Sequence, residues 1–121
     1  MDDDSKKEVA KGKALRFNQG KPDWTLLDYE SLLPAVNVMT FGATKYAREN
    51  WKLPVDDPKQ HLQSAMRHLI AMIQGQEIDF DSNCEDCKRG SCKSHSGERH
   101  SGHIICNMMM YNYHTKSLKS E

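Results

Sequence analysis

Apolar residues recur at helical spacing, three and four positions apart, in three stretches of the chain: residues 28–40, 57–75 and 100–114. Between these stretches the sequence is polar and punctuated by proline and glycine. No stretch shows the convincing alternation of apolar and polar residues that is typical of a half-buried strand, and no segment is repeated. The pattern therefore predicts an all-α fold of three or four helices.

Local signals predict where these helices begin and break. Asp28 can cap the first helix, and Pro34 lies after the favoured first turn, so it either kinks this helix or shifts its start. Gly42 marks a break or a close approach to another element. Asp57 caps the second helix and places Pro58 at the first helical position, which proline prefers.

The second and third helices each carry an apolar stripe on one side. Gly75 ends the second helix. We expect the third helix to bury its stripe. The stripe of the second helix consists of Leu62, Ala65, Met66, Leu69, Ile70 and Ile73, and that of the third consists of Ile104, Ile105, Met108 and Met109.

The composition indicates one domain with a lean core. The chain has 121 residues, of which 37% are hydrophobic and 7% aromatic. In a short chain such a core is often completed by a metal ion or by another subunit. We therefore expect a homo-oligomer, a dimer or tetramer whose helices form an oligomeric bundle. Residues 1–15 are charged and aperiodic, which predicts a disordered arm before a single helical domain over residues 16–121.

Charge and hydropathy limit the cellular compartment and the binding partners that we expect for this protein. Lysine plus arginine and aspartate plus glutamate balance at 17 each, so no net field attracts nucleic acid or an anionic membrane. No apolar run approaches the roughly 20 residues that span a bilayer. The N-terminal Met-Asp-Asp-Asp-Ser-Lys-Lys-Glu has no apolar core for a signal peptide. We expect a cytoplasmic protein that binds neither nucleic acid nor membrane.

A group of cysteines in the polar segment before the third helix has the spacing of a metal site. Cys84 and Cys87 form a Cys-x2-Cys pair, and Cys92 and His95 form a Cys-x2-His pair. Four such ligands are the number that a tetrahedral structural zinc requires, and a reducing cytosol favours metal ligation over disulfides. Cys106 lies apart, and we expect it to be a small buried residue. The alternative for the group is a disordered loop with incidental cysteines; a redox pair is disfavoured, because neither cysteine obviously opens a helix after a strand.

Acidic residues follow the second helix directly. Asp79 and Asp81 stand beside Glu77. Carboxylates clustered at a helix end can hold a magnesium or manganese ion that also engages phosphates. A solvated acidic loop is an equally good interpretation of these residues alone.

Histidine and asparagine recur on one face of each of the last two helices. His61 and His68 are seven positions apart, as are His100 and Asn107, and His103 lies three beyond His100. A polar stripe is ordinary on a surface helix, but this choice of residues suits a polar pocket better than bulk solvent.

Other polar and aromatic residues have types that suit a nucleotide, although ordinary packing also explains them. Arg67 can offer a bidentate donor to a phosphate. Lys45, Tyr46, Asn50 and Trp51 combine a charge, an amide and two aromatic rings within seven positions.

The order of these motifs resembles a phage-enriched family of dATP/dGTP diphosphohydrolases. That family is grouped with the MazG-like all-α nucleotide pyrophosphohydrolases, and some members are called MazZ. The resemblance covers about residues 16–114. It is carried by Asn18-Gln-Gly-Lys21-Pro, Thr40-Phe-Gly-Ala-Thr-Lys45-Tyr46, Asn50-Trp51, Arg67-His68-Leu-Ile-Ala, Gly75-Gln-Glu-Ile-Asp79-Phe-Asp81-Ser82 and His100-x2-His103-x3-Asn107.

The chain departs from the family pattern at one place. Family members usually continue Asp-x-Glu-Ser-Gly directly into His-x2-His, whereas here Asp81 replaces the glutamate and Asn83 the glycine. An inserted loop, residues 84–99, then carries the whole cysteine group. We interpret this loop as an addition that supports the family core. The paired Glu-x2-Glu and Glu-x2-Asp helices of MazG-like proteins are not evident, so the resemblance does not fix the metal ligands.

The resemblance implies metal-dependent hydrolysis of dGTP or dATP to the monophosphate and pyrophosphate, in control of a phage nucleotide pool within the host cytoplasm. Magnesium or manganese would activate water, and Arg67 with Lys45 would stabilise charge on the phosphates. An aromatic side chain would stack on the base and an asparagine would read its edge. The implied catalytic residues are Asp79, Asp81, Arg67, His68 and His103; the implied substrate-binding residues are Lys21, Lys45, Tyr46, Asn50, Trp51 and Asn107.

Two other classes of protein remain possible interpretations of the sequence. A zinc-stabilised binding module that contacts protein or nucleic acid would explain Cys84 to His95 but not the other ordered motifs. A phosphohydrolase of the histidine-aspartate metal type would fit His68, His103 and Asp79, but the adjacent His-Asp pair of that class is missing.

Overall fold

The computed structural model describes residue 14 and residues 19–116. Its helices are α2 (Leu33–Lys45), α3 (Lys59–Ile73), α4 (Glu85–Arg89) and α5 (His100–Thr115). Within these described residues, β-pairing is limited to one isolated bridge between Ile78 and Arg99. The predicted all-α fold of three or four helices is therefore confirmed. The predicted disordered arm, residue 14 excepted, falls outside the described residues.

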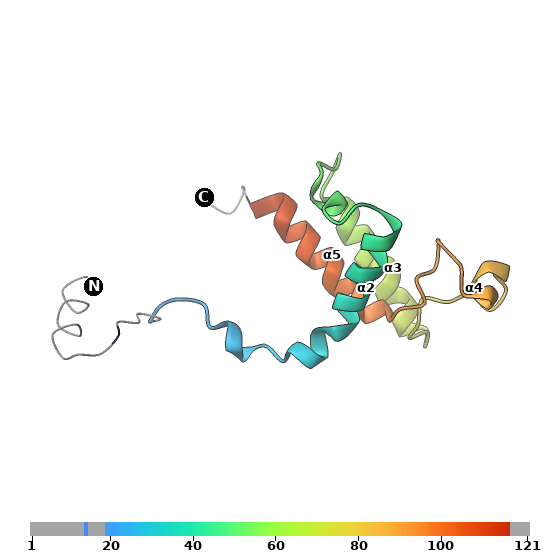
Figure 1. Cartoon of the computed structure of the whole chain (residues 1–121), viewed down its shortest axis with the longest axis horizontal. Coiled ribbons are helices and arrows are strands. Elements are labelled where there is room, and N and C mark those ends of the chain that lie inside the picture. Colours follow the sequence, from blue (N-terminus) through green and yellow to red (C-terminus); the bar gives the residue numbers. More distant parts are fainter. Residues whose placement is uncertain (1–13, 15–18, 117–121) are drawn as a thin grey trace.

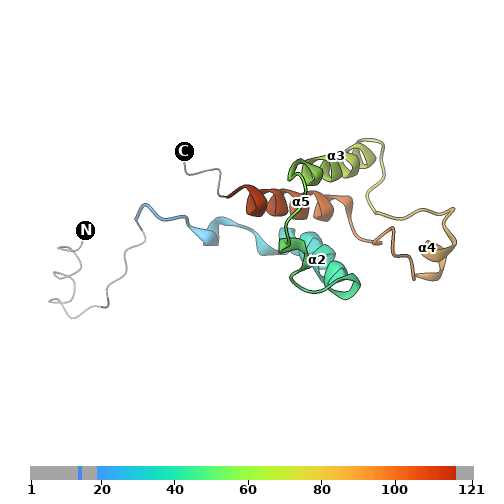
Figure 2. The same ribbon diagram turned by 90° about the horizontal axis from the view of Figure 1, so that it is seen from above.

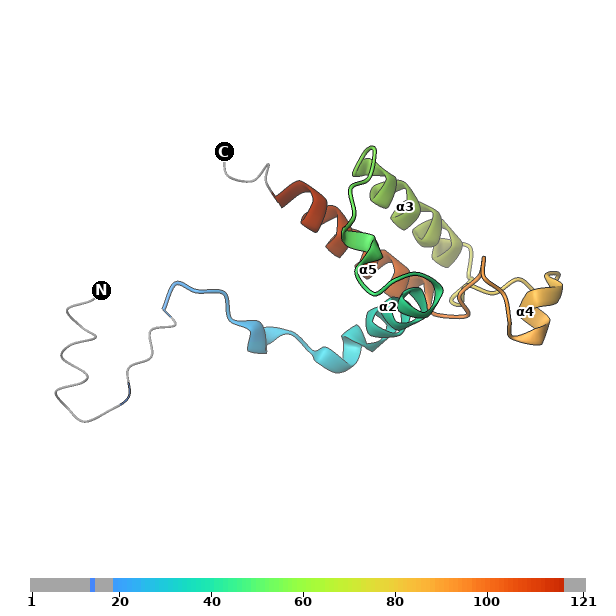
Figure 3. The same ribbon diagram turned by 45° about the horizontal axis from the view of Figure 1, so that its top comes forward.

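Helix α5 is the central element. It packs against α3 on one side and α2 on the other, so that it lies between them in Figure 2. The short helix α4 stands apart from this group on the inserted loop, as Figure 3 shows. The segment before α2 extends away from the helices and contains two 3-10 turns, Trp24–Leu26 and Tyr29–Leu32 (Figure 1). A third 3-10 turn, Asn50–Lys52, contacts α5. No helix in the described ranges is long and apolar enough to cross a bilayer.

Most of the predicted helix boundaries match the structure. Pro34 lies in the first turn of α2 and so shifts the α-helical start to Leu33, after a 3-10 turn. Asp57 Oδ1 accepts a hydrogen bond from the Lys59 N–H at the start of α3. Gly75, at φ 93°, follows the last turn of α3, as a C-terminal glycine should.

The prediction for Gly42 was wrong. Helix α2 continues through it to Lys45, and a Cβ at Gly42 would meet nothing within 4 Å. The close helix approach occurs at Gly102 instead, where a Cβ would lie 2.3 Å from the Pro34 carbonyl oxygen. Only glycine at this position lets α5 lie so close to the start of α2.

The core of the chain is built from small residues, and the predicted buried side of α5 was wrong. Its apolar members Ile105, Met108 and Met109 are exposed, whereas His100, Gly102 and Cys106 are buried. The close contact of α5 with α2 turns small residues inward, and hydrogen-bonded histidines fill the contact with α3. Most of each apolar stripe therefore faces outward, although Ala65 is buried and Leu62 and Ile104 are half-buried. The buried apolar residues are Ala35, Val38, Ala65, Cys87 and Cys106, so the expectation for Cys106 is confirmed.

Candidate functional site

Two adjoining pockets lie among α2, α3 and α5, and Phe41, Lys45 and His103 line both of them. The first, which we call the polar pocket, has a volume of about 370 Å³. The second, the aromatic pocket, has a volume of about 410 Å³. The polar pocket is completed by Arg67, His68, Asp79, Lys93, Ser94, Ser96 and His100. The aromatic pocket also includes Tyr46, Arg48, Asn50, Trp51, Ser64 and Asn107.

A hydrogen-bonded pair of histidines joins α3 to α5 beside the polar pocket. Nδ1 of His68 lies 2.7 Å from Nδ1 of His100, and Nε2 of His100 lies 3.2 Å from Oε1 of Gln76. The Gln76 oxygen can only accept, so His100 carries its proton on Nε2. With no proton on its Nδ1, His100 accepts there from His68. This assignment leaves the lone pair of His68 on Nε2, available for a proton or a metal ion.

His68 also stacks on His103, with ring centroids 4.3 Å apart and planes 2° from parallel. Burial, with His103 and His100 close by, lowers the pKa of His68 to about 4. Burial likewise lowers the pKa of His103, although the Asp79 carboxylate opposes this shift. His68 is therefore neutral near pH 7, which suits a base or a ligand better than a fixed cation.

Asp79 is held by the loop that precedes α5. Its Oδ2 accepts hydrogen bonds from the Ser96 N–H at 3.0 Å and the Ser96 hydroxyl at 3.3 Å, and it lies 3.6 Å from His103 Nε2. The Ser96 hydroxyl oxygen is also 2.5 Å from His103 Nε2. Ser96 thus bridges a carboxylate and a histidine that approach from different elements.

Besides its histidines, the polar pocket has three basic residues: two lie on different helices, and the third, Lys93, lies on the inserted loop. Lys45 ends α2 and donates to the Lys93 carbonyl oxygen at 2.5 Å. Arg67 lies on α3, next to His68 in the sequence. A polyanion entering the pocket would therefore meet positive charge from α2 and α3 and a carboxylate at Asp79.

One wall of the aromatic pocket, at Trp51, packs against α5. Trp51 packs edge-on against Tyr113 at 5.1 Å between centroids, and its carbonyl oxygen lies 2.8 Å from Nε2 of His114. Both hydrogens of the Asn107 amide are used within the protein, by the His103 carbonyl at 2.9 Å and by Ser64 Oγ at 3.2 Å. Of the two asparagines expected to read a base, Asn50 therefore has the freer side chain.

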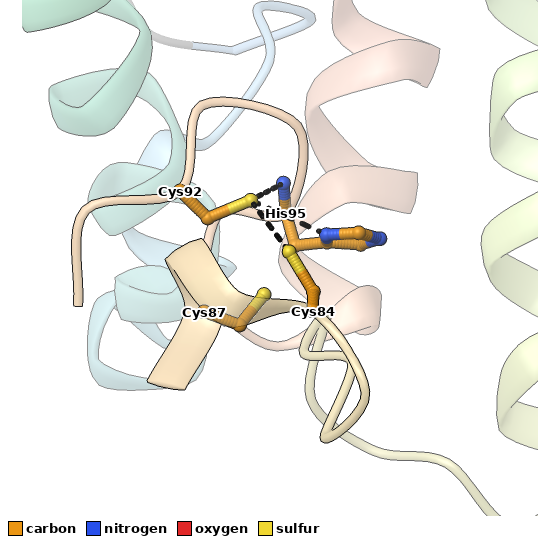
Figure 4. A group of neighbouring side chains, drawn as sticks. All are labelled: Cys84, Cys87, Cys92 and His95. Carbon is orange, nitrogen blue, oxygen red and sulfur yellow. Dashed lines mark hydrogen bonds between the residues drawn. The ribbon is translucent and has the colours of Figure 1, made fainter. Parts of the chain in front are cut away.

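The four predicted metal ligands of the inserted loop meet at one point, as Figure 4 shows. We call Cys84, Cys87, Cys92 and His95 the clip. Its candidate ligand atoms all lie within 4.8 Å of one another, and Cys92 Sγ is 3.8 Å from Cys84 Sγ. Bonds of about 2.3 Å in a tetrahedron put two sulfurs about 3.8 Å apart. The clip could therefore hold a metal such as zinc.

One clip thiol is suited to ligation near neutral pH. Burial raises the pKa of Cys92, but hydrogen bonds from the backbone and ring of His95 and from the Ser94 N–H outweigh it and lower that pKa to about 7. The thiolate is the form that binds metal. Burial raises the pKa of Cys87 to about 11, so this thiol would be deprotonated by the metal itself.

Two of the predicted catalytic and substrate-binding residues lie outside these pockets. Asp81 accepts a hydrogen bond from the Asn83 N–H at 2.9 Å and so closes the turn that leads into the clip. Lys21 lies in a separate recess with Pro22, Asp23 and Trp24. Sequence reasoning missed Gln76 and Ser96. Neither was assigned a role, because glutamine and serine are common in polar loops and their partners are distant in the sequence.

The fold and pockets define a small all-α protein with a histidine-lined polar cavity beside an aromatic one. A family model described as "dATP/dGTP diphosphohydrolase, N-terminal" matches residues 11–120, and the chain belongs to this family. The resemblance to dATP/dGTP diphosphohydrolases noted from the sequence is thereby confirmed. No curated protein and no solved structure matches the chain.

Proposed function

We propose that this protein hydrolyses purine deoxynucleoside triphosphates, dGTP and dATP, to the monophosphate and pyrophosphate. The observation that carries the proposal is the pairing of an aromatic pocket with a cationic, carboxylate-bearing pocket that shares Lys45 and His103 with it. A nucleotide has the same two parts, a flat base and a charged triphosphate. Family membership supports this reaction over others that the pockets would allow.

In this proposal the aromatic pocket holds the base and the polar pocket holds the phosphates. Trp51 and Tyr46 supply aromatic surface for stacking, and Asn50 supplies an amide for the base edge. Lys45 and Arg67 stabilise the charge that develops on the phosphates. The neutral His68 accepts a proton from the attacking water through Nε2.

The donor set of the polar pocket fits a magnesium or manganese ion bound together with the substrate. Such ions are commonly held by one or two carboxylates plus substrate phosphates. Asp79 is a carboxylate of the polar pocket, and Asp81, which lies outside the pocket, follows two residues later as a second candidate ligand. The ion would neutralise phosphate charge and lower the pKa of a bound water.

We also propose that the clip binds zinc and that this zinc has a structural role. One zinc per chain is expected by elemental analysis of protein purified without chelator. The setting that best suits the reaction is the cytoplasm of a phage-infected host, where it would adjust the purine deoxynucleotide pool.

Product analysis tests the proposed reaction directly. Purified protein is incubated with each deoxynucleoside triphosphate and either magnesium or manganese. Pyrophosphate released from dGTP and dATP is the expected result. Release of a single phosphate would instead support a histidine-aspartate type phosphohydrolase, and no turnover with any nucleotide would support a zinc-stabilised binding module.

A further inference from the structure

The clip and the polar pocket are parts of one loop. Cys92 and His95 are clip residues, while Lys93, Ser94 and Ser96 line the polar pocket. Residues therefore alternate between the two sites along the chain. A displacement of the clip backbone would therefore move the wall of the pocket.

Hydrogen bonds tie this wall to both sides of the polar pocket. On one side, the Lys93 carbonyl accepts from Lys45 at the end of α2. On the other, Ser96 contacts the Asp79 carboxylate and His103 through its side chain. Backbone bonds reinforce the second connection: the Gly97 N–H donates to the Asp79 carbonyl at 2.8 Å, and the Asp79 N–H donates to the Glu98 carbonyl at 2.9 Å.

Apart from these hydrogen bonds, the loop has no apolar packing of its own to hold it in place. Residues 90–99 read Gly-Ser-Cys-Lys-Ser-His-Ser-Gly-Glu-Arg, with no large apolar side chain to bury. Burial of apolar surface is the main force that orders a segment, and ordering each residue costs about 1–2 kcal/mol of conformational entropy. A tetrahedral metal ion that joins Cys92 and His95 to Cys84 and Cys87 supplies the missing cross-link.

We propose that metal bound in the clip fixes the position of Ser96, and that Ser96 in turn positions Asp79 and His103 in the polar pocket. The clip therefore controls the pocket geometry as well as the stability of the chain. The role of that geometry in nucleotide hydrolysis rests on the proposed function. Ser96 is a positioning residue, since it acts through Asp79 and His103.

Amide hydrogen exchange tests the coupling without any nucleotide. Exchange is compared in the zinc-loaded chain and after zinc removal by a chelator under non-reoxidising conditions. Zinc removal should speed exchange at the Asp79 and Gly97 amides at least tenfold, while amides of α2 in the Val38–Gly42 turn stay protected. Unchanged exchange at Asp79 and Gly97 would overturn the proposal, and so would an equal loss of protection in α2.

Substitution of Ser96 tests the second step. Ser96→Ala should keep one zinc per chain yet speed exchange at Asp79 and lower kcat about tenfold or more, with a much smaller change in KM. Ser96→Thr restores the hydroxyl and should recover most of kcat. Ser91→Ala is the matched control, because Ser91 is an exposed serine in the same loop beside Cys92; it should behave as the wild type.

The two hypotheses fail in different ways. If zinc removal and Ser96→Ala both change exchange at Asp79 but no nucleotide is hydrolysed, the coupling holds and the proposed function is wrong. If nucleotides are hydrolysed and Ser96→Ala leaves kcat and exchange unchanged, the proposed function holds and Ser96 has no positioning role. Equal effects of Ser91→Ala and Ser96→Ala would also rule out that role.

Discussion

At the scale of single residues, His68 makes stability depend on pH. Its folded-state pKa is about 4, below the ordinary value of 6.5, because of burial and of its histidine neighbours, with Arg67 adding to the shift and Asp79 opposing it. The unfolded chain therefore binds a proton more readily than the folded chain between these values. The contribution of neutral His68 to the free energy of unfolding is fully present above pH 6.5 and is lost as the pH falls toward 4.

We expect the free energy of unfolding to fall between pH 6.5 and 4.5, as measured by urea denaturation at fixed ionic strength. His68→Asn keeps a donor near His100 but removes the titrating ring, so its stability should fall less steeply over this range. His103 has a lowered pKa too, so some slope should remain. An identical slope in the wild type and in His68→Asn would contradict this account.

Asp79 is the residue on which the proposed metal chemistry depends. Asp79→Asn removes a negative charge but keeps an oxygen that can accept from Ser96, so folding and zinc content should be preserved. Pyrophosphate release should fall by about two orders of magnitude or more, because a transition-state interaction is lost. Steady-state kinetics measures this effect.

Two controls show whether the effect of Asp79→Asn depends on where this carboxylate lies or only on the loss of one negative charge. Asp56→Asn changes an exposed loop carboxylate and should leave kcat unchanged. Asp81→Asn should have a smaller effect than Asp79→Asn, because the Asp81 carboxylate closes a turn before the clip. Full pyrophosphate release by both Asp79→Asn and Asp81→Asn would show that the assignment of the metal ligands is wrong.

At the scale of helices, two glycines with opposite surroundings make a matched pair. A Cβ at Gly102 would lie 2.3 Å from a backbone oxygen of α2, so Gly102→Ala should lower the free energy of unfolding by about 1–3 kcal/mol. A Cβ at Gly42 meets nothing within 4 Å inside a helix, so Gly42→Ala should raise it by about 0.5–1 kcal/mol. Chemical denaturation measures both, and a loss of stability in Gly42→Ala with none in Gly102→Ala would contradict the observed packing.

The helices and the clip could be predicted from the sequence, because the signals for both are local. Pro34, Asp57 and Gly75 act within one turn of their own position, and the clip ligands lie within twelve residues of one another. The direction in which each helix faces was not predictable in this way. It depends on the contact of Gly102 with α2 and of His68 with His100, and each of these joins residues more than 30 positions apart.

At the scale of the whole molecule, the apolar side chains that a core would normally bury lie on the outside. Helix α3 turns its histidines toward α5, so most of its apolar stripe faces solvent, and Ile73 is 76% exposed. Helix α5 exposes a second stripe. Groups of exposed apolar residues are typical of protein interfaces. The exposed members are Met66, Leu69, Ile70 and Ile73 on α3 and Ile105, Met108 and Met109 on α5.

We propose that these stripes are covered by further copies of the chain, in a dimer or tetramer. Light scattering at micromolar concentration should then give two or four times the chain mass of 13.9 kDa. Ile70→Glu puts a charge in the middle of the α3 stripe, where it would be desolvated without a partner, so it should shift the mass toward the monomer while helical content is retained. Gln60→Glu adds the same charge to an exposed position away from the stripe and should leave the mass unchanged. A monomeric wild-type chain would contradict the proposal, because the exposed stripes would then have no partner of their own kind.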